Sequence, residues 1–229
     1  AIYVDKNSSL TLDGDETGVY ITSNSAYANG GAIYQEKGEV ETKVISGGET
    51  VTEKVITSGV IRIIAVTLRA NEVETGNGKG VYVNTIGKDF IIGRGKTDDG
   101  IEMLSNNLTI SDELYLANKS IVYVDGLYNP SYIRTNKTIP LRIGFRSNDY
   151  VNSDGSRNIV AEYTNEITGS AIFESVDAGL FSGIGFDGQD CMFCIVDKYK
   201  VAVGKANFAV KYGTGAIKYF ESFRNALYS

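Results

Sequence analysis

Short apolar segments that each begin at a glycine recur through the first part of the chain. Between them lies turn-forming text such as NSAYANGG, SGGET and ETGNGKG. Segments rich in valine, isoleucine and tyrosine favour strands, whereas glycine, serine and asparagine favour turns. The sequence therefore predicts an all-β protein with many short strands. The four clearest segments are Gly18-Val-Tyr-Ile, Gly31-Ala-Ile-Tyr, Gly59-Val-Ile-Arg and Gly80-Val-Tyr-Val.

Residues 1–105 predict a β-helical or solenoid-like shaft, because short strands punctuated by glycine are typical of rungs that stack on one another. An internal repeat, in which Lys43-Val-Ile-Ser-Gly-Gly recurs as Lys54-Val-Ile-Thr-Ser-Gly, belongs to this pattern but is too irregular for a clean solenoid. A rung this short buries little surface by itself. We therefore expect strands of neighbouring chains to complete the rungs, and the N-terminal half not to fold alone.

Residues 106–126 predict transition strands. Leu108 and Ile110, and later Leu114 and Leu116, alternate with other residues at the period of a half-buried strand. Tyr115 falls on the opposite, solvent side of this pattern. An ordinary β-meander of an all-β protein is the structural alternative.

The run NNLTISDELYLANKSIVYVDG resembles the shaft-to-tip transition of trimeric tail fibres of tailed bacteriophages, including long L-shaped side fibres. The resemblance implies a homotrimer with an intertwined β-helical shaft in 1–105, and a β-rich receptor-binding tip in 127–229. It implies attachment of the virion to a bacterial surface polysaccharide, such as the O-antigen of lipopolysaccharide, or to an outer-membrane receptor. It also implies assembly in the cytoplasm of the bacterial host.

Two alternatives stay open, an autotransporter-type bacterial adhesin and a polysaccharide-degrading tailspike. The text VISGGETV…VITSGV is similar to the passenger repeats of bacterial autotransporter adhesins, and NGGAIY is similar to a motif of another outer-membrane passenger family. Phage tailspikes of related architecture cut polysaccharide, and glycoside cleavage needs only two carboxylates. We expect binding rather than catalysis, so the chain is not expected to be an enzyme.

The segment 127–158 contains both prolines and much of the sequence that is rich in turn-forming residues. Within it, Pro140-Leu-Arg-Ile-Gly-Phe predicts a strand. Sugar recognition requires aromatic faces and polar planar groups on loops held by a rigid scaffold. The alternative is that these side chains are solvated turn residues and tyrosines that cap the core. The predicted receptor-binding residues are Tyr128, Tyr132, Arg134, Asn148, Asp149, Tyr150, Asn152 and Asp154.

Residues 159–229 predict a meander of hairpins, with turns at Gly204-Lys205 and Gly213-Thr214-Gly215. A short helix is predicted over 221–227.

The chain ends at Ser229. Some of the phage fibres that the chain resembles release a C-terminal intramolecular chaperone by self-cleavage just after a serine, so the resemblance makes Ser229 a candidate processed terminus. An ordinary chain end is the alternative.

Charge and composition exclude several classes of function. The net charge is −6 and the chain has no basic block, which argues against nucleic acid as a partner. No apolar run is long enough for membrane insertion, and AIYVDKNSSL lacks the regions of a signal peptide. Without histidine, the usual triads and metal sites are not expected, and no cofactor is predicted.

The two cysteines, Cys191 and Cys194, stand three apart in the run DCMFCIV. On a strand, residues three apart point to opposite faces, so the two thiols are predicted to be unpaired, with at least one buried. Unpaired thiols suit assembly in a reducing compartment.

Overall fold

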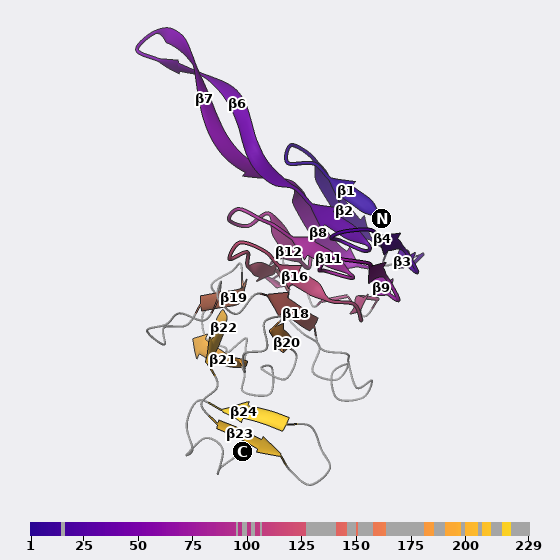
Figure 1. Cartoon of the computed structure of the whole chain (residues 1–229). Helices are drawn as coiled ribbons and strands as arrows, with labels where there is room; N and C mark the ends of the chain where they lie inside the picture. Colours follow the sequence, from indigo (N-terminus) through magenta and orange to yellow (C-terminus); the bar gives the residue numbers. More distant parts are fainter. Residues whose placement is uncertain are drawn as a thin grey trace.

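The computed structural model describes residues 1–14, 17–94, 96–97, 100–101, 104–105, 107–126, 141–145, 150, 158–163, 181–185, 191–197, 200–205, 208–211 and 217–220. All elements with described bounds are β-strands, so the prediction of an all-β chain is confirmed. Most strands belong to sheets whose neighbours lie far apart in the sequence (Figure 1).

Two large sheets form the body of the molecule. Sheet A contains six strands, all parallel to their neighbours: β1 (Ile2–Val4), β5 (Ile33–Gln35), β11 (Val81–Val83), β16 (Leu114–Leu116), β18 (Leu141–Phe145) and β20 (Phe181–Gly185). Sheet B contains seven strands: β2 (Ser9–Asp13), β8 (Val60–Ala65), β12 (Phe90–Ile92), β17 (Val122–Val124), β19 (Asn158–Tyr163), β22 (Lys200–Lys205) and β21 (Cys191–Asp197). Its last two pairings, β19 with β22 and β22 with β21, are antiparallel.

Smaller sheets complete the described structure. Sheet C is parallel and contains β3 (Tyr20–Thr22), β9 (Thr67–Arg69) and β15 (Thr109–Ile110). A further parallel pair joins β4 (Ser25–Ala26) and β10 (Glu72–Val73). The antiparallel pairs are β6 (Lys37–Ser46) with β7 (Glu49–Ser58), β13 (Lys96–Thr97) with β14 (Gly100–Ile101), and β23 (Phe208–Lys211) with β24 (Ile217–Phe220).

The chain visits the sheets in a repeated order. It passes from β1 in sheet A to β2 in sheet B and β3 in sheet C, and then returns to sheet A at β5. We call each such passage a rung. Strands of successive rungs pair in register, as Ile2 with Ile33 and Ile33 with Val81. Inward-facing side chains such as Ile33, Ile61 and Leu68 have no exposed surface and belong to one continuous hydrophobic core.

Polar side chains stack between rungs in the same way as the strands do. The Asn24 side-chain amide donates to the Asn71 Oδ1 at 2.9 Å, and the Asn71 amide donates to the Asp112 Oδ2 at 2.6 Å. Each of these residues follows a strand of sheet C in its own rung. The ladder supplies hydrogen-bonding partners to Asn71 and Asp112, which are nearly buried, and buried polar groups are costly without partners.

Three of the glycines that begin the predicted strands, Gly31, Gly59 and Gly80, stand where neighbouring rungs approach closely. A Cβ on Gly59 would lie 2.7 Å from the Asp5 carbonyl oxygen and 2.8 Å from the Val4 Cγ1. Only glycine leaves room for this contact. The segments that begin at Gly18, Gly31, Gly59 and Gly80 contain strands β3, β5, β8 and β11, so these four predicted strands are confirmed.

The internal repeat has a different structure from the one predicted. Its two copies lie in β6 and β7, the antiparallel strands of one hairpin, and not in stacked rungs. Gly47 and Gly48 form the connecting turn with φ of 62° and 87°, values that glycine adopts readily. The hairpin projects away from the sheets and is inserted between β5 and β8 (Figure 1). We call it the arm, residues 37–58.

The predicted transition strands are present as β15, β16 and β17. The prediction that β16 is half-buried, with Tyr115 on its solvent side, is wrong, because Tyr115 is only 3% exposed. Sheets A and B continue through the expected boundaries near residues 105 and 126, because β16 pairs with both β11 and β18, and β17 with both β12 and β19.

The C-terminal part agrees with the sequence in its strands and differs in one turn. The strand predicted after Pro140 is β18, and the hairpins β21–β22 and β23–β24 are present. The turn predicted at Gly204-Lys205 is wrong, because both residues belong to β22. The predicted helix over 221–227 lies outside the described residues. Cys191 and Cys194 both lie on β21, as predicted, but their side chains are outside the described part.

Candidate functional site

Among the predicted receptor-binding residues, the structure describes Tyr150 alone, and there the prediction is wrong. Tyr150 is completely buried. Its hydroxyl donates a hydrogen bond to the Ser120 carbonyl oxygen at 2.6 Å, and its ring packs edge-on against Phe145 with centroids 5.3 Å apart. The ring is part of the core, as the alternative interpretation held, and offers no face to a sugar. The other predicted residues lie outside the described part: Tyr128, Tyr132, Arg134, Asn148, Asp149, Asn152 and Asp154.

The outer face of sheet C brings together aromatic and hydroxyl side chains from three rungs. Tyr20 of β3 pairs in register with Thr67 of β9, and Thr67 pairs with Thr109 of β15. The neighbouring residues on β9 and β15, Leu68 and Ile110, are buried in the core. Because side chains alternate along a strand, the row from Tyr20 to Thr109 faces outward.

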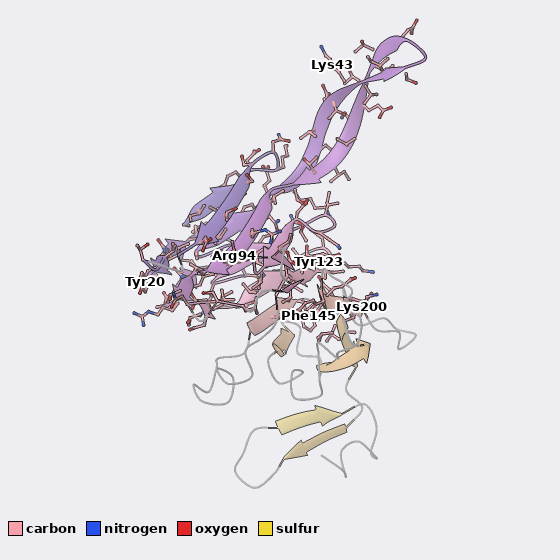
Figure 2. All side chains as sticks on the ribbon, turned by 180° about the vertical axis from the view of Figure 1, so that it is seen from behind. Tyr20, Lys43, Arg94, Tyr123, Phe145 and Lys200 are labelled. Atoms are coloured by element: carbon pink, nitrogen blue, oxygen red, sulfur yellow. The ribbon has the colours of Figure 1, made fainter. Side chains whose placement is uncertain are left out.

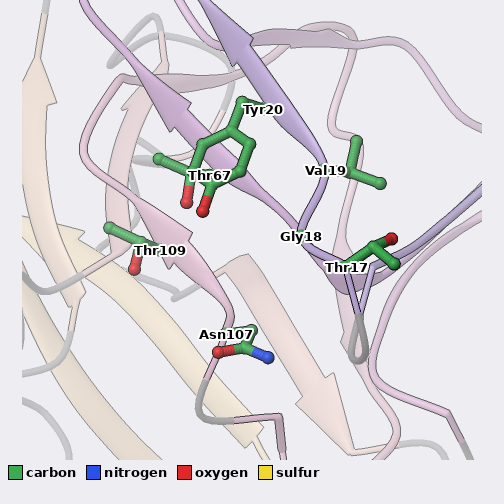
Figure 3. A pocket seen from close by; sticks show the side chains of 7 residues that line it. All are labelled: Thr17, Gly18, Val19, Tyr20, Thr67, Asn107 and Thr109. Atoms are coloured by element: carbon green, nitrogen blue, oxygen red, sulfur yellow. The ribbon is translucent and has the colours of Figure 1, made fainter.

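A shallow polar groove lies along this row. It has a volume of about 310 Å³ and is lined by Thr17, Gly18, Val19, Tyr20, Thr67, Asn107 and Thr109. Figure 3 shows that the oxygen atoms of Tyr20, Thr67 and Thr109 point in the same general direction, with Asn107 beside them. Tyr20 is 69% exposed. The groove therefore combines an accessible aromatic ring with hydroxyl and amide groups, and the described residues of its lining include no carboxylate.

A second outward row, one step along the same strands, extends this surface. Thr22 pairs in register with Arg69 on β9, and Arg69 is exposed. Ser111 follows β15, and its backbone N–H donates to the Leu68 carbonyl oxygen at 2.9 Å. The surface beyond the groove thus adds a guanidinium group and further hydroxyl groups. We call the groove and this second row the sheet C face.

The sequence alone did not single out the sheet C face. Tyr20 is recognisable as a strand residue, but its neighbours Thr67 and Thr109 come from rungs far along the chain. The signal that was available is a tyrosine next to an apolar core position, Ile21, in a very short strand. Finding its partners required the register between rungs.

Tyrosines also stack along sheet A. The rings of Tyr3, Tyr34, Tyr82 and Tyr115 lie nearly parallel, with successive centroids 5.6, 5.1 and 5.6 Å apart. Exposure falls from 61% at Tyr3 to 3% at Tyr115. Since the ring faces are occupied by neighbouring tyrosines, we interpret this tyrosine stack as a structural feature rather than a platform for a ligand.

The first two tyrosines of the stack have perturbed acidity. The Glu36 carboxylate, which accepts a hydrogen bond from the Tyr3 hydroxyl, is the main cause that raises the pKa of Tyr3 to about 12. Burial, with a smaller contribution from Glu36, raises the pKa of Tyr34. Both effects favour the neutral phenol, so neither hydroxyl is prepared to act as a nucleophile or base near neutral pH.

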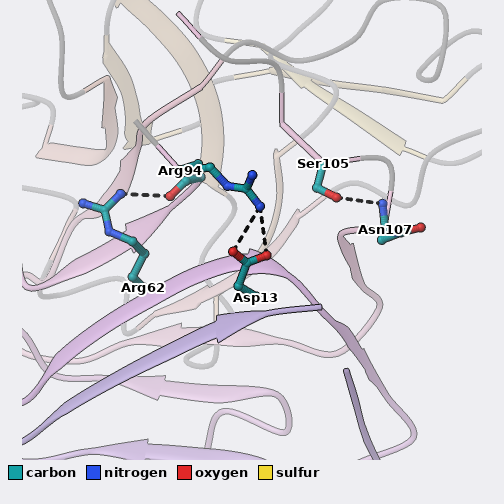
Figure 4. A network of polar contacts seen from close by, with 6 residues as sticks. Asp13, Arg62, Arg94, Ser105 and Asn107 are labelled. Carbon is teal, nitrogen blue, oxygen red and sulfur yellow. Dashed lines mark hydrogen bonds and ion pairs between the residues drawn. The ribbon is translucent and has the colours of Figure 1, made fainter. Parts of the chain in front are cut away.

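Arginines bind carboxylates on sheet B and at its edge. Arg62 Nη1 lies 3.0 Å from Asp125 Oδ2 and donates to the Gly93 carbonyl oxygen at 2.9 Å. Arg94 Nη2 contacts both Asp13 carboxylate oxygens, at 2.9 and 3.0 Å (Figure 4). These pairs join different rungs. Arg94 and Asp13 are each about two-fifths exposed, so their contribution to stability is at most about 1 kcal/mol.

Within the described residues, no group of three or more cysteine, aspartate or glutamate side chains is arranged to hold a metal ion. The same residues contain no helix with the length and apolar character needed to cross a membrane. Ser229 lies outside the described part.

Comparison of the chain with protein-family models, curated proteins and solved structures found no match.

Proposed function

We propose that this chain is the receptor-binding part of a fibre of the trimeric phage tail-fibre type, and that it binds a bacterial surface polysaccharide such as O-antigen. The observation that carries the proposal is the groove of the sheet C face, where Tyr20 presents an exposed ring beside the hydroxyl groups of Thr67 and Thr109. Sugars offer apolar ring faces and many hydroxyl groups, and such a surface is complementary to both.

The scaffold supports the same proposal. In-register parallel strands, the Asn24–Asn71–Asp112 ladder and the tyrosine stack are features that we interpret as those of a β-solenoid. A solenoid is an elongated, rigid support on which outward side chains hold fixed spacings. We propose further that three such chains associate in the virion fibre, after assembly in the host cytoplasm, and that residues 127–158 add contacts to the receptor.

Binding is favoured over cleavage of the polysaccharide. Glycoside hydrolysis requires two carboxylates flanking the bond to be cut, and none is among the described residues that line the groove. A tailspike would release reducing ends from its polysaccharide, whereas the proposed fibre would leave it intact.

The test is binding of the purified chain to a panel of immobilised bacterial surface polysaccharides. We expect Tyr20→Ala to weaken binding about tenfold, equivalent to about 1.4 kcal/mol, because the sugar loses its stacking surface. Tyr27→Ala is the matched control, since Tyr27 is 74% exposed and does not line the groove. Equal binding of the Tyr20 variant and the parent would place the receptor site elsewhere.

A further inference from the structure

The arm is the longest regular element among the described residues, and most of it packs on no other part of the chain that the structure describes. Its strands form ten consecutive antiparallel pairs, from Lys37 with Ser58 to Ser46 with Glu49. At about 3.4 Å per residue, the arm is roughly 30 Å long. Figures 1 and 2 show it standing away from the sheets. Every residue from Glu49 to Ile56 is exposed.

Among the described residues, the arm touches the sheets only at its base. The Ser58 hydroxyl donates to the Asp89 carboxylate, and Gly38 lies beside the Lys6 side chain. An isolated two-stranded hairpin is marginally stable in water. The outer part of the arm therefore lacks the packing that a hairpin of this length normally needs.

The two faces of the arm differ in character. Residues directly opposite each other in an antiparallel pair share a face. Val40 pairs with Val55, and Val44 pairs with Val51, so four valines lie on one face, with Thr42 and Glu53 between them. We call this the valine face. The opposite face carries Glu41 with Lys54 and Lys43 with Thr52, together with Ile45 and Ile56.

Charge and area point to the kind of partner that the valine face fits. Within the arm, Lys37, Lys43 and Lys54 nearly balance Glu39, Glu41, Glu49 and Glu53, so no strongly charged partner is favoured. A two-stranded face of this length covers roughly 300 Å², far less than the roughly 800 Å² per partner of a stable independent interface. The arm is thus suited to extend a contact between molecules that already meet elsewhere.

We propose that the valine face of the arm is covered by the arm of a second copy of this chain, so that the arms of an assembly pack together. The inference rests on the proposed association of identical chains. Apolar faces built from the same Val40–Val55 and Val44–Val51 pairs are self-complementary, and facing sheets pack about 10 Å apart with their side chains interdigitated. Burial of the valines supplies the packing that each arm lacks by itself.

Cross-linking tests this inference in the full chain. In a background with Cys191→Ser and Cys194→Ser, Val51→Cys places a thiol on the valine face, and Thr52→Cys places one on the opposite face at the same height. After treatment with a short bifunctional thiol reagent, we expect the Val51 variant to give covalently joined chains on a denaturing gel, at least tenfold more than the Thr52 variant. Equal cross-linking of the two variants, or none, would overturn the inference.

A second measurement separates this inference from the proposed function. Val44→Glu should weaken self-association at least tenfold in sedimentation experiments, whereas Lys43→Glu on the other face should change it far less. An oligomer whose mass and association are unaffected by Val44→Glu contradicts the packing of the arms alone. A monomeric parent chain contradicts the association of chains as well, and polysaccharide binding by the Tyr20 groove is measured independently of either result.

Discussion

Tyr20 and Tyr150 have the same side chain and opposite surroundings. Tyr20 stands on the outer face of a short strand with 69% of its surface exposed, and Tyr150 is closed in the core with its hydroxyl bonded to Ser120. Removal of either ring should therefore affect a different property. Loss of Tyr20 is expected to reduce ligand binding, whereas changes at Tyr150 are expected to reduce the free energy of unfolding.

Tyr150→Phe should lower the free energy of unfolding by about 1 to 2 kcal/mol, because the Ser120 carbonyl oxygen loses a buried donor while the ring packing on Phe145 remains. Thermal and denaturant unfolding followed by circular dichroism measure the change. Tyr27→Phe, at an exposed tyrosine, is the control and should leave unfolding unchanged. Identical unfolding curves for all three proteins would contradict the role assigned to the Tyr150 hydroxyl.

The acidity of Tyr3 gives a prediction with a defined sign. Its pKa in the folded protein is raised to about 12 from an ordinary value near 10, chiefly by the hydrogen bond to Glu36. A raised tyrosine pKa contributes stability that is fully present below about pH 10 and is lost as the pH rises through about 12. Glu36→Gln should move the titration of Tyr3 toward pH 10.

The titration of Tyr3 is measured by the tyrosinate absorbance near 295 nm, as the difference between each protein and its Tyr3→Phe counterpart. The subtraction isolates one phenol among the 15 tyrosines of the chain. A Tyr3 titration that is the same with glutamate or glutamine at position 36 would show that the carboxylate is not the cause.

At the scale of elements, the tyrosine stack forms ring contacts between four strands of sheet A that are adjacent in space and distant in sequence. Tyr34 has a ring on each side, with centroids 5.6 and 5.1 Å away. Each aromatic pair contributes about 0.5 to 1.5 kcal/mol beyond the area that it buries. Tyr34→Ala should thus destabilise the protein by about 1 to 3 kcal/mol.

Tyr34→Phe keeps both ring contacts and should cost much less than Tyr34→Ala in the same unfolding experiment. A double-mutant cycle between Tyr34 and Tyr82 measures their coupling directly. Additive effects of the two alanine substitutions would mean that the rings are neighbours without energetic interaction.

The arm is the other element with a clear prediction. Replacement of residues 40–55 by Asn-Gly leaves Glu39 and Ile56, which already pair, on either side of a two-residue turn. Within the described structure, the removed part contacts the rest of the chain at the base of the arm, where Lys54 forms an exposed ion pair with Glu39 that contributes little to stability. The melting temperature of the sheets should therefore change little at a protein concentration where the chain is dissociated. A large loss of melting temperature under that condition would show that the outer arm supports the sheets.

At the scale of the whole molecule, the sequence identifies strands better than it identifies their partners. Glycine followed by alternating apolar residues was enough to locate β5, β8 and β11. It could not reveal that Ile33 pairs with Val81, because the arm is inserted within the rung that begins at β5 and interrupts any regular spacing. The repeat at Lys43 and Lys54 likewise did not reveal that its two copies pair as the strands of one hairpin.

For the candidate site, too, the sequence indicated the kinds of residue but not which of them become neighbours. The expected elements of a sugar site, an aromatic ring with hydroxyl and amide groups, are present on the sheet C face, but the sequence placed them in 127–158. Tyr20, Thr67 and Thr109 become neighbours only through the parallel register. Burial of Tyr150 was likewise not readable, because a tyrosine in turn-rich text has no pattern that separates a core position from a surface position.

The assembled molecule should be larger than one chain and slow to unfold. Light scattering on the purified protein is expected to give about three chain masses rather than 24.8 kDa. Parallel pairings such as Leu10 with Ile61 join distant parts of the chain, and many such contacts must break together before an associated protein of this kind unfolds. Unfolding in denaturant that is complete within seconds, together with a single-chain mass, would contradict this prediction.

The two ends of the arm meet at its base, where the Gly59 backbone N–H donates to the Glu36 carbonyl oxygen at 3.0 Å. The arm begins and ends at nearly the same point. Its insertion therefore does not change the pairing of β5 and β8 with their neighbours. Such a junction can accept a hairpin of another length or sequence without a shift of the strands that follow. The corner between β5 and β8 is therefore a natural acceptor for transplanted loops, and a foreign epitope or a different recognition hairpin grafted there should be displayed at a fixed height along the molecule.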